Sequence, residues 1–170
     1  MRTVSSAQEP ANSNIGGREP VHVMTDTVDC GHHQVDGGCH CGAVRFRVKL
    51  KGGLGAARRC NCSICRMRGA VALTADLADF EIVQGEDKLS VYSFNTGVAR
   101  HYFCSACGIY THHQRRSDPN EFGVNAACLD GLSPFDFEEV IVTDGQHHSK
   151  DEPGGVARPP VGVLRFVKIR

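Results

Sequence analysis

The sequence has no tryptophan, no net charge and no long apolar run, and these absences exclude several classes of protein. No segment approaches the roughly 18 consecutive apolar residues that a membrane helix requires. Balanced charge argues against a nucleic-acid or membrane surface, because phosphate groups are bound by clustered positive charge. The polar N-terminus lacks the apolar segment of a secretory signal. We therefore expect a soluble, cytoplasmic protein that binds neither nucleic acid nor membranes.

Short segments of alternating polarity predict a mainly β fold. In residues 44–50 the apolar side chains alternate with Arg45, Arg47 and Lys49, which is the period of a half-buried strand. One short helical turn is expected after Cys62. Many short strands separated by turns favour antiparallel sheets or an open barrel. The remaining strand candidates are residues 71–74, 79–83, 89–94, 99–103, 109–112, 121–125 and 139–143.

Composition divides the chain into three parts. Residues 1–36 are rich in Ser, Asn, Gly, Pro and Thr, and we expect a flexible N-terminal extension there. Residues 37–143 hold the strand candidates and form the expected domain. Residues 144–170 begin with a Gly-, His- and Pro-rich stretch and end in an apolar run, which predicts a linker and a C-terminal strand.

Nine cysteines is a high and odd number for an intracellular chain. Cysteines one or two residues apart do not pair easily with each other, but they can converge on one metal ion. Seven of them fall into three clusters, whereas Cys30 and Cys128 stand alone and are interpreted as bystanders. The clusters are Cys39 and Cys41; Cys60, Cys62 and Cys65; and Cys104 and Cys107.

The first and third clusters together supply four thiolates. A closed tetrahedral zinc site commonly takes its ligands from two short clusters that lie far apart in sequence. An ion bound by Cys39, Cys41, Cys104 and Cys107 would staple the first strand to a late hairpin and stabilise a modest core. The alternative is a disulfide or free buried thiols.

The middle cluster supplies three ligands, the number found in catalytic zinc sites with one open position. Three thiolates leave the ion weakly electrophilic, so Cys60, Cys62 and Cys65 favour activation of another thiol over hydrolysis. The alternative is a second closed site, with His101, His112 or Cys128 as the fourth ligand. An iron–sulfur cluster is a further possibility.

Acid–base and substrate-binding residues are less well defined by the sequence. His101, His112 and His113 flank the third cluster, and of these His101 and His112, together with Asp130, are the first candidates for proton transfer. Four arginines bracket the middle cluster, either as solvated surface charge or as an anion clamp. We selected Arg66 as the candidate ligand for a substrate carboxylate.

Three motifs resemble one family. GCHCGAVRF at residues 38–46, CNCSICR at 60–66 and FCSACG at 103–108 resemble the glutathione-dependent formaldehyde-activating enzyme family, which also includes centromere protein V. The resemblance implies an Mss4-like β fold, a structural zinc on the four paired cysteines and a catalytic zinc on the other three. It also implies a carbon–sulfur lyase that forms S-hydroxymethylglutathione from formaldehyde and glutathione. The chain departs from the family in lacking a tryptophan after the last core strand, where it carries residues 144–149 instead.

Two functions are therefore expected from the sequence. The first is an enzyme with two zinc ions that acts on a small thiol such as glutathione. The second is a non-catalytic zinc module that binds a protein partner, as the centromere relative suggests. An open fourth position on the zinc of Cys60, Cys62 and Cys65 favours the enzyme, and a closed position favours the module.

Overall fold

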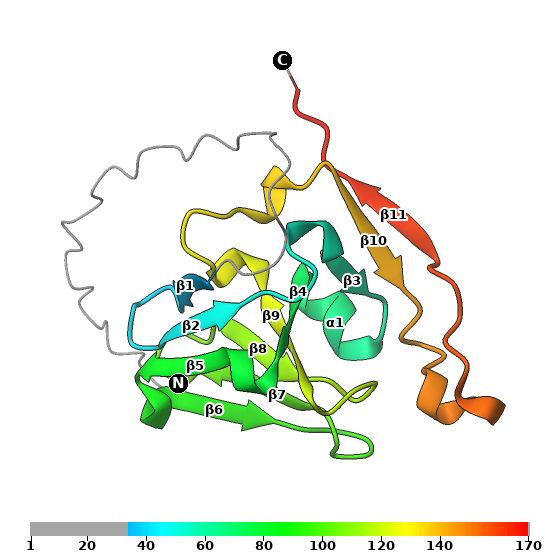
Figure 1. The fold of residues 1–170 in the computed structure, drawn as a ribbon, viewed down its shortest axis with the longest axis horizontal. Helices are drawn as coiled ribbons and strands as arrows, with labels where there is room; N and C mark the ends of the chain where they lie inside the picture. Colours follow the sequence, from blue (N-terminus) through cyan, green and yellow to red (C-terminus); the bar gives the residue numbers. More distant parts are fainter. Residues whose placement is uncertain (1–33, 170) are drawn as a thin grey trace, which may run out of the picture.

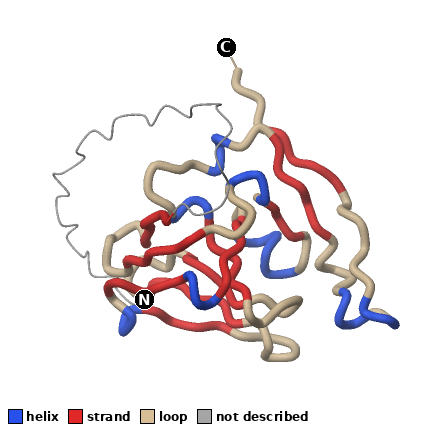
Figure 2. The backbone as a smooth tube through the Cα atoms, viewed as in Figure 1, coloured by secondary structure: helices blue, strands red, loops and turns tan. Residues whose placement is uncertain are grey.

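The computed structural model describes residues 34–169, and this part of the chain is mainly β (Figures 1 and 2). The strands are β1 Gln34–Gly38, β2 Arg45–Lys49, β3 Arg58–Cys60, β4 Ala72–Asp76, β5 Phe80–Gln84, β6 Leu89–Tyr92, β7 Arg100–Cys104, β8 Tyr110–Gln114, β9 Glu121–Asn125, β10 Glu139–Thr143 and β11 Gly162–Arg165. The α-helix is α1, Ser63–Arg68, and the 3-10 turns are Leu54–Ala56, Leu77–Asp79, Glu86–Lys88, Ala126–Cys128, Pro134–Asp136, Ser149–Asp151 and Pro153–Gly155.

The strands form two sheets. The smaller sheet has the order β1-β2-β5, and the larger has the order β11-β10-β3-β4-β9-β8-β7-β6. All neighbours are antiparallel except β3 and β10, which pair in parallel from Arg58↔Ile141 to Cys60↔Thr143. The expectation of purely antiparallel sheets was therefore wrong at this one junction. That junction brings Cys60 beside the end of β10, which is central to the site described below.

Most predicted strands are present, and the errors have physical causes. β9 and β10 have the predicted bounds, and α1 follows Cys62 as expected. β1 was missed because QVDGG contains two glycines and a single apolar residue, yet it pairs along its whole length with β2. Its residues 34–36 belong to the expected N-terminal extension, and the rest of that extension lies outside the described residues. β3 was missed because its sequence, RRC, has no apolar alternation.

The core lies where the inward faces of the two sheets meet. In β2 the alternation works as the sequence predicts, since Phe46 and Val48 are fully buried and the residues between them are partly exposed. Leu73 of β4 and Val124 of β9 are also fully buried and belong to the same cluster. Each such side chain contributes about 1.5–3 kcal/mol by leaving water, so the sheets form a stable framework for the cysteine clusters.

The C-terminal segment extends the larger sheet. β11 pairs antiparallel with β10, from Glu139↔Arg165 to Val142↔Gly162, and forms its edge (Figure 1). The expected C-terminal strand is therefore present at residues 162–165. Within residues 34–169, no helix combines the length and apolar character needed to cross a membrane.

Candidate metal centres and an arginine-lined pocket

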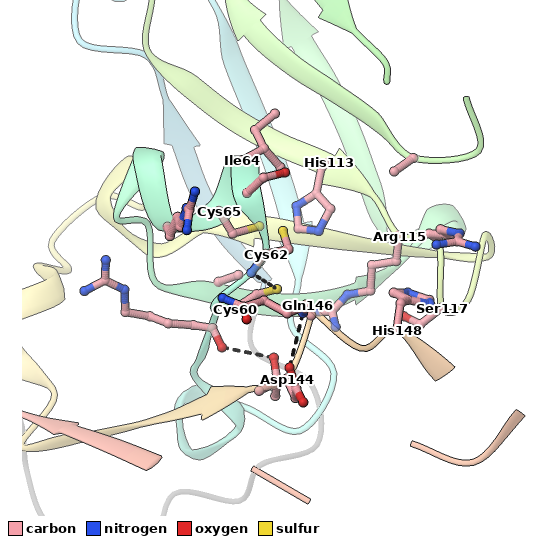
Figure 3. Close-up of a pocket in the computed structure, with 18 of the residues that line it drawn as sticks. Cys60, Cys62, Ile64, Cys65, His113, Arg115, Ser117, Asp144, Gln146 and His148 are labelled. Atoms are coloured by element: carbon pink, nitrogen blue, oxygen red, sulfur yellow. Dashed lines mark hydrogen bonds between the residues drawn. The ribbon is translucent and has the colours of Figure 1, made fainter. Parts of the chain in front are cut away.

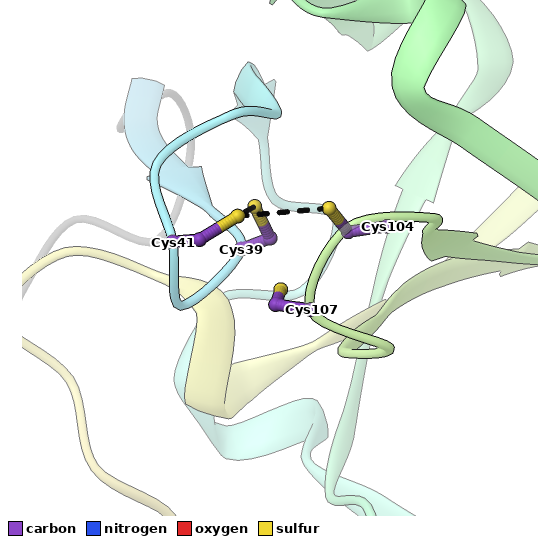
Figure 4. Close-up of side chains that lie close together, drawn as sticks. All are labelled: Cys39, Cys41, Cys104 and Cys107. Atoms are coloured by element: carbon purple, nitrogen blue, oxygen red, sulfur yellow. Dashed lines mark hydrogen bonds between the residues drawn. The ribbon is translucent and has the colours of Figure 1, made fainter. Parts of the chain in front are cut away.

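Four cysteines from two distant turns converge at one point (Figure 4). Cys39 and Cys41 lie in the turn between β1 and β2, Cys104 is the last residue of β7, and Cys107 lies in the turn between β7 and β8. Their sulfur atoms all lie within 4.8 Å of one another. Gly42 and Gly108, one after each pair, have positive φ angles of 76° and 73°, a conformation that glycine adopts without strain. These turns fold both pairs of cysteines towards each other.

The spacing of these sulfurs fits a tetrahedral metal ion. Zinc–sulfur bonds of about 2.3 Å place neighbouring sulfurs about 3.8 Å apart on a tetrahedron. Cys41 Sγ lies 3.6 Å from Cys39 Sγ and 3.8 Å from Cys104 Sγ. The backbone N–H of Val44 donates to Cys39 Sγ at 3.3 Å, a contact that stabilises a thiolate. Cys39 and Cys104 are buried, Cys107 is partly exposed and Cys41 is exposed, so this group could hold a metal ion near the surface.

The remaining three motif cysteines form a second group (Figure 3). Cys60 ends β3, Cys62 caps the start of α1, and Cys65 lies one turn further along that helix. Their sulfurs lie within 4.8 Å of one another, and all three residues are partly exposed. The helical turn is thus what converts a linear spacing into a convergent group that could hold a metal ion.

The three thiols are hydrogen-bonded to one another, so the pKa of each depends on the other two. Hydrogen bonds from Cys60 and Cys65 lower the pKa of the Cys62 thiol to about 2, and the backbone N–H groups of Cys65 and Ile64 add to this. The same hydrogen bonding raises the pKa of Cys65, which cannot ionise easily beside its neighbours. These hydrogen bonds therefore favour ionisation of Cys62 over Cys65. A divalent cation would displace the remaining protons, which is the behaviour of a metal site.

No fourth metal-ligating side chain completes this second group within residues 34–169. Of the alternatives raised by the sequence, Cys128 is buried elsewhere, and its thiol donates to the carbonyl of Tyr110 at 3.4 Å. His112 lies in the core, stacked on Tyr102 at 4.5 Å between ring centroids. His101 lies near the group but does not join it. The lack of a fourth protein ligand among residues 34–169 therefore favours an open metal site over a closed one.

The open side of the three-cysteine group faces a cavity of about 730 Å³. This is the size of a typical small-molecule site. Seven arginines line it, but only two acidic residues, so the cavity carries a strong positive charge even though the whole chain is neutral. The arginines are Arg58, Arg59, Arg66, Arg68, Arg115, Arg116 and Arg158. An anionic ligand matches this pocket, because guanidinium groups bind carboxylates in two-point contacts.

Among the arginines that form ion pairs in residues 34–169, Arg115 has the least exposed side chain. Its side chain is 12% exposed and donates to Thr74 Oγ1 at 2.9 Å. Its Nε lies 3.9 Å from a carboxylate oxygen of Glu121, which is too far for a hydrogen bond, and this buried N–H has no other partner within the described chain. Burial lowers the pKa of this guanidinium. Because Nε is covered, an anion in the pocket would meet Arg115 through its other guanidinium nitrogens.

His101 of β7 lies beside the pocket but is already engaged. Arg68 lies 3.0 Å from its Nδ1, and since arginine can only donate, Nδ1 must accept and Nε2 must carry the proton. Burial, with help from Arg68, lowers the pKa of His101 to about 4, so the ring is neutral. Its Nε2 is covered and has no partner in residues 34–169. These constraints make His101 a poor candidate for proton transfer.

His113 lines the pocket and was not selected from the sequence. Its ring lies on the same side of the pocket as Cys62 in Figure 3, and its Nδ1 is hydrogen-bonded to Tyr110 Oη. Burial, reinforced by Arg115, lowers the pKa of His113 to about 3. Gly123 of β9 lies opposite, where a Cβ would come within 2.2 Å of the ring. The sequence feature that could have pointed to His113 is the alternation of side chains along β8, because His112 and His113 point to opposite faces of the strand.

The structure does not bring the other selected residues together. His112 faces the core, and Asp130 pairs with Arg45 beside the smaller sheet, so neither lines the pocket. Arg66 does line the pocket, from the exposed side of α1. Proton transfer by His112 or Asp130 therefore finds no support in the geometry, whereas Arg66 remains a candidate at the rim.

The fold and its two cysteine groups define a small, cysteine-rich β protein with the donors for metal ions and a basic pocket. Residues 34–143 match the model of the glutathione-dependent formaldehyde-activating enzyme family, and the chain belongs to that family. A Halomonas elongata protein provisionally named for this family is 39% identical over 82 residues. That match covers 43% of the chain and 51% of the relative, so the chain spans about half the length of this curated relative.

A solved structure supports the fold. A crystal structure of a Rhodobacter sphaeroides protein is 56% identical in sequence and superposes with a TM-score of 0.63. The match covers 99% of that protein but 64% of this chain. A substantial part of this chain therefore has no counterpart in that structure, and residues 144–170 lie beyond the family match.

Proposed function

We propose that this protein is a zinc-dependent enzyme of the carbon–sulfur lyase type. Its substrate would be the adduct of a thiol such as glutathione with a small carbonyl compound such as formaldehyde. One observation carries the proposal: within the described chain, three convergent cysteines have no fourth protein ligand and open onto a pocket lined by arginines. The family's name supplies the thiol and the carbonyl compound.

We assign zinc to both cysteine groups. Four thiolates with tetrahedral spacing suit a closed structural site, in which Cys39 and Cys41 are tied to Cys104 and Cys107. Zinc held by Cys60, Cys62 and Cys65 would offer an open position to a substrate thiol and lower the pKa of that thiol. Iron–sulfur clusters remain a less suitable occupant, because no fourth cysteine completes the second group within residues 34–169.

The arginines would bind and orient the substrate. Glutathione carries two carboxylates, and Arg115, whose side chain lines the pocket, can anchor one. Arg66, at the exposed rim, can hold the other. Such two-point binding fixes the sulfur over the three cysteines, so that the reacting atoms meet without a further loss of entropy.

Proton transfer falls to His113 in this proposal. In the forward direction the substrate thiol gives up its proton, its sulfur bonds to the carbonyl carbon as the carbon–oxygen π bond breaks, and the carbonyl oxygen takes up that proton. In reverse, the hydroxyl loses that proton, the carbon–sulfur bond breaks and the thiolate departs. With Nδ1 of His113 held by Tyr110, its Nε2 is the nitrogen left to relay the proton from the substrate thiol to the carbonyl oxygen.

The test uses Cys62→Ser, with Cys128→Ser as a matched control because Cys128 is a buried thiol outside both groups. We expect two zinc ions in the wild type and in the control by elemental analysis, but one in Cys62→Ser, with a retained fold. Exchange of ¹³C-formaldehyde with glutathione, followed by NMR, should be accelerated by the wild type and not by Cys62→Ser. A wild type with one zinc, or a variant that unfolds, would instead support a non-catalytic zinc module.

A further inference from the structure

A loop outside the family match forms part of the pocket wall. Residues 144–161, here called the pocket loop, join β10 to β11 and follow directly after the matched residues 34–143. The pocket lining continues into this loop from Asp144 to Arg158. The loop closes on itself where the backbone N–H of Val161 donates to the carbonyl of Val142 at 2.9 Å. It therefore starts and ends at the same place on the sheet.

The near end of the pocket loop is bonded to the three-cysteine group. Asn61 lies between Cys60 and Cys62, and its Oδ1 accepts from the backbone N–H of Gly145 at 2.7 Å and of Gln146 at 3.1 Å. Its Nδ2 donates to Asp144 Oδ1 at 3.3 Å. A Cβ on Gly145 would lie 2.2 Å from Cys60 Sγ, so the loop backbone rests directly on one of the three sulfurs.

The middle of the pocket loop is held to the rest of the described structure by one ion pair. Asp151, in the turn Ser149–Asp151, forms a two-point contact with Arg116, and the Nη1–Oδ2 distance is 2.7 Å. Arg116 follows β8, the strand that carries His113, so this pair joins the loop to a different part of the pocket wall. The other ion pairs of the loop, Arg158 with Glu152 and His147 with Asp144, lie wholly within it.

We propose that the pocket loop is the specificity element of this enzyme: it covers the three-cysteine site, restricts it to small thiols, and is held in place by the Arg116–Asp151 ion pair. This inference rests on the function proposed above. Asp151 is a positioning residue, because it acts through the loop and not on the substrate. The side chains of Arg116 and Asp151 are 18% and 54% exposed, so salt should weaken their attraction.

The test compares three variants with the wild type, all as zinc-loaded full-length proteins. Asp151→Asn removes the negative charge that pairs with Arg116 across the pocket, and Asp151→Glu keeps that charge. Glu152→Gln is the matched control, since it removes the same charge one residue away from a pair that lies within the loop. Two readouts are used: amide hydrogen exchange of residues 146–158, and formaldehyde exchange with glutathione and with coenzyme A as a bulky thiol.

We expect Asp151→Asn to speed amide exchange in the loop about two- to fivefold, the range that a partly exposed ion pair supports. The rate with coenzyme A should rise by a similar factor while the rate with glutathione changes little. High salt should bring the wild type towards the variant, Asp151→Glu should restore the wild-type values, and Glu152→Gln should not differ from the wild type.

The inference is overturned if Asp151→Asn and Glu152→Gln behave alike, or if loop exchange and thiol preference do not change. Hydrogen exchange needs no substrate, so it tests the ion pair even if the protein has no activity. If the wild type shows no activity, only the proposed function is refuted. Unchanged loop exchange in an active enzyme would refute the role of Asp151 alone.

Discussion

Substitution of Gly145 by alanine is the most direct test of how the pocket loop meets the three-cysteine group. Gly145 does not have a positive φ angle, so alanine is compatible with its backbone, and only the space matters. The new Cβ would lie 2.2 Å from Cys60 Sγ and 2.9 Å from Cys62 Cβ. Contacts under 3.0 Å are essentially never seen, so the sulfur or the loop must shift by about 0.8 Å.

Such a shift matters because metal–ligand distances tolerate only about 0.2 Å. We therefore expect Gly145→Ala to weaken zinc binding by the three cysteines about 10- to 100-fold, while the four-cysteine group keeps its ion. Zinc affinity is measured by competition with a chromophoric chelator, and metal content by elemental analysis after dialysis. The matched control is Gly162→Ala at the start of β11, where an added Cβ meets nothing within 4 Å. Two ions bound with wild-type affinity in Gly145→Ala would refute the placement of the loop.

Two further predictions concern stability. Cys104→Ser should lower the free energy of unfolding by about 3 kcal/mol and the melting temperature by about 10 °C. The reason is that it removes a fully buried thiol of the group that joins the β1–β2 and β7–β8 turns. A variant that melts at the wild-type temperature would contradict a structural ion there. Burial lowers the pKa of His112 to about 3, so its stabilising contribution is complete above pH 6.5 and is lost as the pH falls towards 3. His112→Phe should reduce the slope of unfolding free energy against pH by about 1.4 kcal/mol per unit near pH 5, measured by urea titration, and an unchanged slope would argue for a solvated His112.

The sequence predicts those features that depend on local patterns. The alternation of Phe46 and Val48 with charged residues defined β2 and its buried face, and both have the expected burial. The cysteine clusters defined which sulfurs converge, since residues two or three apart reach one point whenever the chain turns between them. Both inferences need only neighbouring residues and the geometry of the backbone.

Features that depend on contacts between distant segments were not predicted. The sequence shows His112 and His113 as equal candidates, and only the orientation of β8 decides that His113 faces the pocket. Arg115 resembles a surface residue in the sequence, yet pairing of its backbone with Glu121 places it in the pocket wall. The linker expected from residue 144 onwards forms part of the pocket because Asn61 and Arg116 bind it. Long-range pairing leaves no periodic signal in the segments involved.

The contrast between the two cysteine groups is the strongest argument for chemistry at the smaller one. Cys39 and Cys104 are buried, and their four-cysteine group contacts Val44 and Leu89 in a small apolar cluster, as suits a site that only holds the fold together. Cys60, Cys62 and Cys65 are all partly exposed and border a charged cavity. The seven arginines that line this cavity would attract an anion that approaches the three cysteines. That charge supports the proposal of a substrate thiol that carries carboxylates.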